Sequence, residues 1–265
     1  MLRKLFAFLY RDFLIAISYK FGFLLTLGGI LFSTAGFFFL SRLFEYTPSS
    51  LKIYGGYFPF VIIGIAFSDY MMTALHSFSS TIREGQVTGT LEALLLTRTK
   101  VSTIVLFSSV FSFLFTTLRV FFYLLFGTLL FGISFKGNLL GAIIIFILTI
   151  IVFASLGIIS ASFIMVFKRG DPLSWIFTSA STLLGGVFYP ISVLPGWLRN
   201  FSFILPITYS LKGIRMCLLA GAGLRDILPQ ILVLSGFVIV LFPLSLFLFK
   251  SAIDRAKKDG TLTQY

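Results

Sequence analysis

The sequence predicts an all-α membrane protein with six transmembrane helices. Of its 265 residues, 58% are hydrophobic and 11% are charged, and the mean hydropathy is +1.04. A chain of this composition has too much apolar surface to bury in a soluble core. Several uninterrupted apolar stretches also reach the roughly 20 residues that a helix needs to cross a bilayer. We therefore interpret residues 1–265 as one transmembrane domain.

The first 20 residues predict an amphipathic helix at the cytoplasmic membrane interface. Apolar side chains recur at helical spacing, and charged side chains take the other side. The apolar positions are Leu2, Phe6, Leu9, Phe13 and Ile17, and the charged positions are Arg3, Lys4, Arg11 and Asp12. The alternative is that this segment extends the first membrane helix inward. No small-residue cleavage site follows, so we do not expect a removable signal peptide.

Five apolar stretches are long enough to cross the membrane, and one more is shorter. The five cover residues 21–40, 57–80, 101–131, 139–167 and 228–249. The shorter one, fifth in chain order, covers residues 172–188 and begins with Asp171 as a predicted N-cap and Pro172 at the first helical position. It rises about 25 Å, less than the roughly 30 Å hydrocarbon core, so we expect it to end inside the membrane.

The apolar segment that follows is interrupted by Pro190, Pro195 and Pro206. Each proline removes a backbone donor and clashes with the preceding turn, so helix persists only in short pieces. Irregular backbone at membrane depth must be buried in protein or line a cavity. We predict a re-entrant helical hairpin over residues 190–211, between spans 5 and 6; an external loop on the bilayer surface is the alternative. The predicted interfacial anchors are Trp197 and Tyr209, with Arg199 near the headgroups.

The basic residues predict that both termini are cytoplasmic. The formal net charge is +12, but these residues are scattered between apolar stretches, which indicates topology and not a nucleic-acid surface. With both termini inside, thirteen of the 21 Lys and Arg residues are cytoplasmic and Arg119 lies in a span. The outer side then carries Arg42, Lys52, Lys136, Arg199, Lys212, Arg215 and Arg225.

Three ionisable residues, Asp69, His76 and Arg119, lie inside predicted spans. Such a group costs a few kcal/mol in a membrane unless it is paired or hydrated. A cytoplasmic hairpin joins the spans of Asp69 and Arg119, so these two side chains can face each other, either as a structural pair or as part of a transport path. We interpret His76 as an interfacial or inter-helix residue. The 35 phenylalanines leave open whether aromatic rings line that path.

The cytoplasmic segment 82–100 predicts a short capped helix that docks on a partner. Gly85 and Gly89 loosen the chain, Thr90 can cap, and Glu92 stands in the first turn of a helix over residues 91–97. An apolar helix presented to water indicates a docking surface. Its apolar positions are Leu91, Leu94 and Leu95. The alternative is a plain connecting turn.

The sequence contains no sign of an enzyme active site. It has no Gly-x-x-x-x-Gly-Lys-Ser/Thr phosphate loop. One cysteine and one histidine exclude an intrachain disulfide and a metal site of several Cys and His ligands. The one histidine, His76, lies in a predicted span, so we expect no serine or cysteine nucleophile with a histidine base. We therefore expect neither catalysis nor a metal.

Two motifs make the chain resemble the membrane subunit of a type-2 ABC exporter. The first joins Glu84-Gly85 to Gly89-Thr90-Leu91-Glu92. The second runs from Phe188 through Tyr189-Pro190 and Leu194-Pro195-Gly196-Trp197 to Leu205-Pro206-Ile207-Thr208-Tyr209, with Arg215 after it. Its proline-glycine-tryptophan form favours the drug and nodulation-factor exporters over the large-polysaccharide branch.

The resemblance implies a permease that moves an amphipathic, lipid-like or glycan substrate outward by alternating access. A second permease subunit, identical in a homodimer, and two cytosolic ATPase subunits would complete it in the plasma (cytoplasmic) membrane. ATP and Mg would bind the ATPase, and this chain would bind no cofactor. ATPase coupling would fall to Glu84, Gly89, Thr90, Leu91, Glu92, Leu94 and Leu95, and the external gate to Tyr189, Pro190, Leu194, Pro195, Trp197, Pro206 and Tyr209. The competing interpretation is an ATP-independent secondary transporter that uses Asp69 and Arg119 for ion coupling, or a membrane scaffold.

Overall fold

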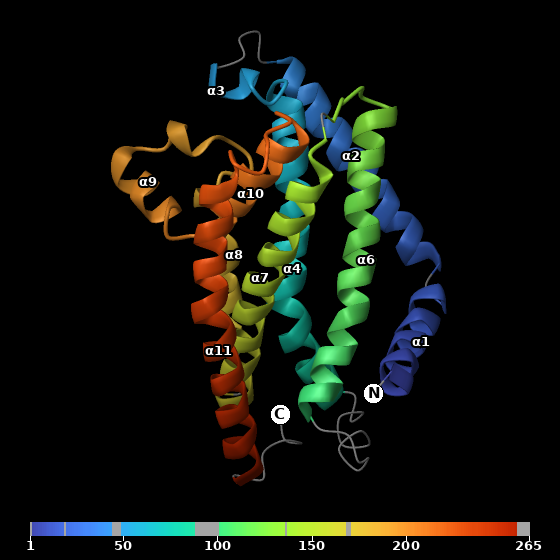
Figure 1. Ribbon diagram of the computed structural model, residues 1–265. Coiled ribbons are helices and arrows are strands. Elements are labelled where there is room, and N and C mark those ends of the chain that lie inside the picture. The colour runs from blue at the N-terminus through green and yellow to red at the C-terminus, as the bar shows by residue number, and fades with distance from the viewer. Residues whose placement is uncertain are drawn as a thin grey trace.

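The chain forms a bundle of long helices, and every regular element of the described residues is helical (Figure 1). The computed structural model describes residues 2–18, 20–43, 49–87, 101–135, 137–167 and 171–258. The long helices are α2 (Lys20–Arg42), α4 (Tyr57–Val87), α6 (Val101–Leu129), α7 (Leu139–Phe167) and α11 (Leu228–Lys258). The shorter elements are α1 (Leu2–Ser18), α3 (Ser49–Lys52), α8 (Pro172–Leu184), η1 (Ile191–Val193), α9 (Gly196–Ser202) and α10 (Pro206–Leu218).

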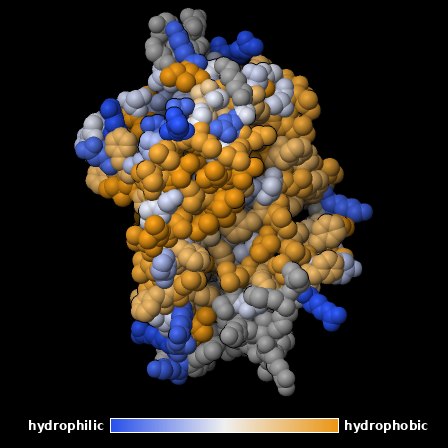
Figure 2. Space-filling view, viewed as in Figure 1, coloured by the Kyte–Doolittle hydropathy of each residue, from blue (hydrophilic) through white to orange (hydrophobic). Residues whose placement is uncertain are grey.

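Five helices have the length and apolar composition to cross a membrane. They contain residues Lys20–Arg42, Tyr57–Thr81, Ser109–Leu129, Leu139–Phe167 and Leu228–Arg255. All five coincide with stretches that the sequence predicts as spans. The chain is therefore an integral membrane protein, and Figure 2 shows the expected wide hydrophobic belt with hydrophilic side chains gathered toward both ends.

Helices α4 and α7 form the centre of the bundle. Half of the apolar window of α7 and 67% of that of α4 are buried, against 11% for the other three candidate spans. Helix α7 is apolar all round, which suits a position enclosed by α4, α10 and α11. Its hydroxyl groups donate to carbonyls one turn earlier, as Thr149 does to Ile145 at 2.7 Å. The sparsely buried α2, α6 and α11 thus present apolar side chains outward, as lipid-facing helices do.

The short helix α8 begins as the sequence predicts and ends earlier. Asp171 is its N-cap, and its side chain accepts a hydrogen bond from the Ser174 amide at 3.0 Å. The helix stops at Leu184, four residues before the predicted end at Phe188, because Gly186 turns the chain with a φ of +78°. Thirteen residues rise only about 20 Å, so a sixth crossing stays a prediction.

Helix α1 is separate from α2 and lies at an angle to it beside α6 (Figure 1). Its apolar side chains include Phe6 and Phe13, which are 70% and 51% exposed. Figure 1 also shows that α1 begins and α11 ends toward the same end of the bundle, which we call the terminal end, with α3 at the opposite end, the α3 end. The interfacial position of α1 remains a prediction.

Candidate functional site

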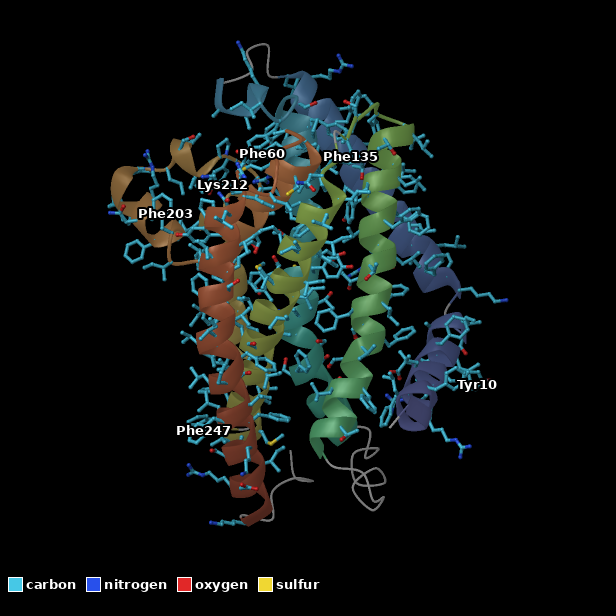
Figure 3. The ribbon with its side chains drawn as sticks, in the orientation of Figure 1. Tyr10, Phe60, Phe135, Phe203, Lys212 and Phe247 are labelled. Carbon is cyan, nitrogen blue, oxygen red and sulfur yellow. The ribbon has the colours of Figure 1, made fainter. Side chains whose placement is uncertain are left out.

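The proline-rich segment forms a projecting arm and a buried return helix. The arm consists of η1 and α9, which stand out from the bundle near the α3 end (Figure 1). On this arm Trp197 is 67% exposed, and Figure 3 shows Phe203 where the chain leaves the arm. The return helix α10 packs against α7 and buries Ile207, Leu211 and Ile214. The segment is therefore anchored through α10, and α9 rests on α8 with its outer side exposed.

Side chains of the arm hold its turns together. Arg199 donates from Nη2 to the carbonyls of Ser192 and Leu194 at 3.3 and 3.4 Å. The Tyr209 hydroxyl donates to the Phe203 carbonyl at 3.0 Å, and the Tyr189 hydroxyl donates to the Leu183 carbonyl. These contacts lie within the hairpin and the end of α8, so the arm is internally braced.

The seven predicted gate residues differ in how far they are buried. Leu194 and Pro206 are buried, Tyr189, Pro190 and Tyr209 are half-buried, and Pro195 and Trp197 are exposed. The structure thus places six of them in the hairpin 190–211 and Tyr189 directly before it. Their assignment as a gate remains a prediction.

Arg215 binds the end of α8 to α4 and is 3% exposed. Its Nη1 donates to the Gly186 carbonyl at 2.8 Å, its Nη2 to the Val187 carbonyl at 3.0 Å, and its Nε to the Phe60 carbonyl at 3.0 Å. The guanidinium carbon lies 3.4 Å from the centroid of the Phe60 ring. Figure 3 shows Phe60 near the α3 end, close to α10. One side chain on α10 therefore joins three elements.

This position corrects the sequence analysis, which counts Arg215 among the positive charges of the outer side. The Arg215 side chain is buried in the protein. Only exposed loop arginines indicate which side of the membrane a loop is on, so Arg215 should not be counted. Gly64 explains how the enclosure forms. A Cβ at Gly64 would lie 2.2 Å from the Val187 carbonyl oxygen and 2.7 Å from Arg215 Nη2, so only glycine lets α4 approach this closely.

Asp171 makes the matching contact at the other end of α8. In addition to the Ser174 amide, its carboxylate accepts hydrogen bonds from Ser79 Oγ of α4 at 2.9 Å and from Ser160 Oγ of α7. His76 Nδ1 of α4 lies 3.6 Å from Asp171 Oδ2. Burial alone would raise the pKa of the Asp171 carboxyl, but hydrogen bonds from His76, Ser160 and Ser174 outweigh it and hold the pKa well below its ordinary value. His76 thus lies between α4 and the N-terminus of α8.

Opposite charges therefore hold the start of α8 and the turn after it, and we call Asp171 and Arg215 together the α8 clamp. The carboxylate at the helix N-terminus complements the helix dipole. Both ends are tied to α4, at Ser79 and at Phe60. Since those residues are 19 positions apart, the tied length of α4 is about 28 Å, close to the hydrocarbon thickness.

The predicted contact between Asp69 and Arg119 is present between α4 and α6. Arg119 Nη2 lies 2.7 Å from Asp69 Oδ1, and the two side chains are 28% and 20% exposed. Thr73 and Thr116 share a hydrogen bond of 2.7 Å beside the pair, and Arg119 Nη2 donates to Thr116 at 3.3 Å. The Tyr70 hydroxyl donates to Thr117 across the same helices. The ion pair belongs to a polar layer, so neither charge is isolated.

Most of the predicted coupling segment lies outside the described residues. This applies to Gly89, Thr90, Leu91, Glu92, Leu94 and Leu95. The backbone at Glu84 continues α4, which runs to Val87 beyond the membrane-length window ending at Thr81. Helix α4 thus extends toward the terminal end in the direction that the prediction requires.

A match to a known protein family identifies the class of membrane protein to which this chain belongs. The family model for the ABC-2 type transporter matches residues 3–219, which covers everything from α1 to the end of the hairpin. The chain belongs to the ABC-2 transporter family. A comparison with curated protein sequences gave no match.

Membership makes this ABC-2 chain the membrane permease subunit of a transporter, a class that typically works with a cytosolic ABC ATPase. Two features of this permease were not recognised from sequence as parts of one site: the buried position of Arg215 and the close approach at Gly64. An arginine inside an apolar, proline-broken segment is the sequence signal for the first, because such a residue requires acceptors. A glycine inside an otherwise large-residue span is the signal for the second.

Proposed function

We propose that this ABC-2 permease is the membrane subunit of an ATP-driven exporter in which the hairpin 190–211 is the external gate. The observation that carries the proposal is the α8 clamp. A short helix held at both ends against α4, followed by an internally braced arm, is suited to move as a unit. Alternating access requires rigid elements that move between two packed arrangements.

The proposed topology counts α8 as the fifth of six crossings, with both termini cytoplasmic. Support comes from the tied length of α4, about 28 Å, which α8 and the turn after it match. The terminal end would then face the cytosol, where the ends of α4 and α6 meet the segment 82–100. Helix α10 and the arm would dip into the outer leaflet, and α1 would lie at the inner interface.

The proposed assembly is a homodimer of this chain with two copies of a cytosolic ATPase in the plasma membrane. ATP and Mg would bind only the ATPase. Glu92 with Leu91, Leu94 and Leu95 would dock on it, and the substrate would be an amphipathic, lipid-like or glycan molecule. The family membership and the apolar arm support this assignment.

Reconstitution with the ATPase tests the proposal. A candidate cytosolic ABC ATPase would be co-expressed and co-purified with this chain, and the complex placed in liposomes that contain fluorescent NBD-labelled phosphatidylglycerol. ATP-dependent movement of the probe between leaflets, lost with an ATPase whose catalytic glutamate is replaced, is the expected result. No association with any cosynthesised ATPase and no ATP dependence would overturn it.

The half-buried Asp69–Arg119 layer supports one alternative, an ATP-independent transporter with ion coupling. That function predicts movement of substrate by the chain alone in response to a proton gradient. The same liposomes without ATPase separate the two functions, because the exporter is inactive there.

A further inference from the structure

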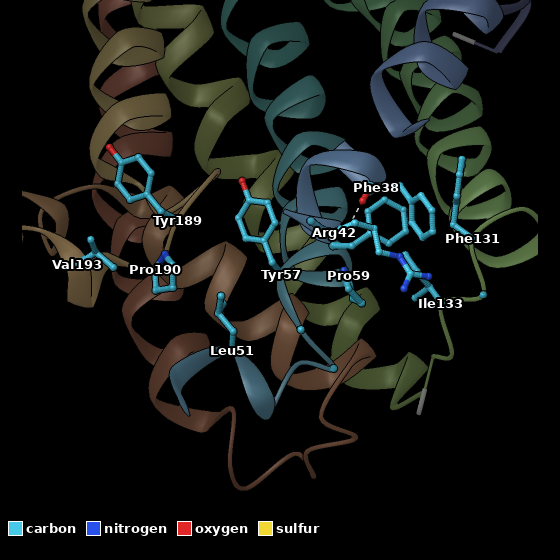
Figure 4. Close-up of a pocket in the computed structure, with 15 residues that line it drawn as sticks. Phe38, Arg42, Leu51, Tyr57, Pro59, Phe131, Ile133, Tyr189, Pro190 and Val193 are labelled. Atoms are coloured by element: carbon cyan, nitrogen blue, oxygen red, sulfur yellow. Dashed lines mark hydrogen bonds between the residues drawn. The ribbon is translucent and has the colours of Figure 1, made fainter. Parts of the chain in front are cut away.

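A pocket near the α3 end is walled by α2, the α3–α4 turn, the end of α6 and the start of the hairpin. Its volume is about 460 Å³, within the range of small-molecule sites. In Figure 4, Phe38, Arg42 and Phe131 lie at one end, Tyr189, Pro190 and Val193 at the other, and Tyr57 between them. We call it the outer pocket.

Aromatic rings from α2, α4 and the turn after α6 form one wall of the outer pocket. Phe38 of α2 lies 4.6 Å from Phe131 and 5.3 Å from Phe58 of α4, measured between ring centroids, and Phe58 lies 5.6 Å from Phe131. Mutually packed rings make a stable apolar surface. This wall suits the hydrocarbon part of a ligand.

Arg42 places a positive charge at the edge of that wall. Its guanidinium carbon lies 5.0 Å from the centroid of the Phe38 ring, one helical turn earlier on α2. The ring positions the guanidinium without neutralising it. No carboxylate occurs among the described residues that line the pocket, and none of the described residues forms a salt bridge with Arg42. The pocket therefore favours an anion over a cation.

The opposite wall belongs to the hairpin. Tyr189, Pro190 and Val193 follow directly on Gly186 and Val187, whose carbonyls Arg215 holds. A ligand in the pocket would consequently touch both α2 and the first residues of the arm. The affinity for the ligand would therefore depend on the position of the hairpin relative to α2.

We propose that the outer pocket binds an anionic amphiphile, with its charged group at Arg42 and its apolar part on the ring wall. Two sources share this chemistry: an anionic phospholipid of the outer leaflet and an anionic exported substrate. The proposal deepens the proposed function by giving the charge of the ligand. The charge preference of the pocket can be tested without the ATPase, so its failure would leave the export proposal intact.

Photolabelling tests the pocket in lipid nanodiscs of phosphatidylcholine. The probe is a C16 alkyl sulfonate with a diazirine at the chain, and its neutral sulfonamide is the matched control. We expect the sulfonate to label residues 57–59 and 189–193 about three- to fivefold more than the sulfonamide, a ratio typical of a partly exposed ion contact. Arg42→Gln should abolish the preference and Arg42→Lys should restore part of it. Arg225→Gln, at an exposed arginine outside the pocket, should leave it unchanged.

Equal labelling by the two probes, or a preference that survives Arg42→Gln, would overturn the proposal. Phosphatidylglycerol in the disc identifies the source when it competes with the sulfonate, because the ligand is then a membrane lipid. Insensitivity to phosphatidylglycerol, with loss of labelling when the complex is trapped with ATP and vanadate, identifies a transported anion. Both outcomes support an anionic amphiphile at this site.

Discussion

Replacing Arg215 by methionine tests the α8 clamp directly. Methionine retains an unbranched stem and has no donors, so Arg215→Met removes all three hydrogen bonds and the charge while keeping the packing of the stem. The carbonyls of Gly186 and Val187 accept no other hydrogen bond among the described residues. The Phe60 carbonyl lies in α4 and keeps its helical partner. Two buried acceptors are therefore left without donors.

The expected loss follows from those two carbonyls. A buried acceptor that loses its partner costs about 1–3 kcal/mol, so the pair costs about 2–6 kcal/mol. Removing a buried cation returns part of its desolvation penalty, which lowers the net loss to about 2–4 kcal/mol. At about 2–4 °C per kcal/mol for a chain of this size, Arg215→Met should melt about 4–16 °C lower. Arg215→Lys should fall between, because one ammonium cannot span three carbonyls.

Tryptophan fluorescence in detergent during heating measures the difference, since Trp197 lies on the arm and Trp175 on α8. Arg199→Met is the control: Arg199 also donates to two carbonyls, but at 3.3 and 3.4 Å in the projecting arm, so a change within about 0.5 kcal/mol is expected. If Arg215→Met melted within 1–2 °C of the wild type, about the size of the expected Arg199→Met shift, the guanidinium would not hold α8 to α4 and the clamp would be refuted.

Three further substitutions test the remaining sites. Asp69→Asn and Arg119→Gln should each destabilise more than the double replacement, because either alone leaves an unpaired group between α4 and α6; additive melting shifts would show that they are not partners. Asp171→Ala should cost about 1–3 kcal/mol and Asp171→Asn, still an N-cap, clearly less; a loss for Asn as large as for Ala would contradict the N-cap role, and no loss for Asn would contradict a role for the charge. The depressed pKa of Asp171 further predicts that its contribution is fully present above about pH 4 and lost only as pH falls toward its folded pKa, so melting between pH 5 and 8 should not report this group. Glu92→Ala should preserve expression and weaken ATPase association or transport-stimulated hydrolysis, and unchanged stimulation would end its assignment to coupling.

The elements that the sequence predicted well depend on local chemistry. Asp171 before Pro172 predicts a helix start because the carboxylate caps the first amides and the proline fixes a helical φ. Both features are present at the start of α8. The Asp69–Arg119 contact could be predicted because a cytoplasmic hairpin joins the two spans and brings them side by side. Opposite charges inside neighbouring spans are expected to pair.

The elements that it missed depend on contacts between distant segments. Arg215 and Phe60 are separated by 155 residues, so the sequence around either residue does not indicate that the two are in contact. The end of α8 at Leu184 was placed too late because apolar character continues to Phe188, whereas the turn at Gly186 is fixed by the carbonyls that Arg215 binds. The outer pocket combines α2, α4, α6 and the hairpin, and no single stretch contains its pattern.

Thiol labelling of the hairpin in the assembled transporter tests the central claim, that residues 190–211 form an external gate driven by ATP. Single cysteines at Ser192, Gly223 and Lys258, in a chain with Cys217→Ala, would be exposed to a membrane-impermeant reagent on sealed vesicles. We predict that Gly223 labels from outside in every state, that Lys258 stays protected, and that labelling at Ser192 changes between the nucleotide-free and vanadate-trapped complexes. External labelling of Lys258, or labelling at Ser192 that is the same in all nucleotide states, would contradict the account.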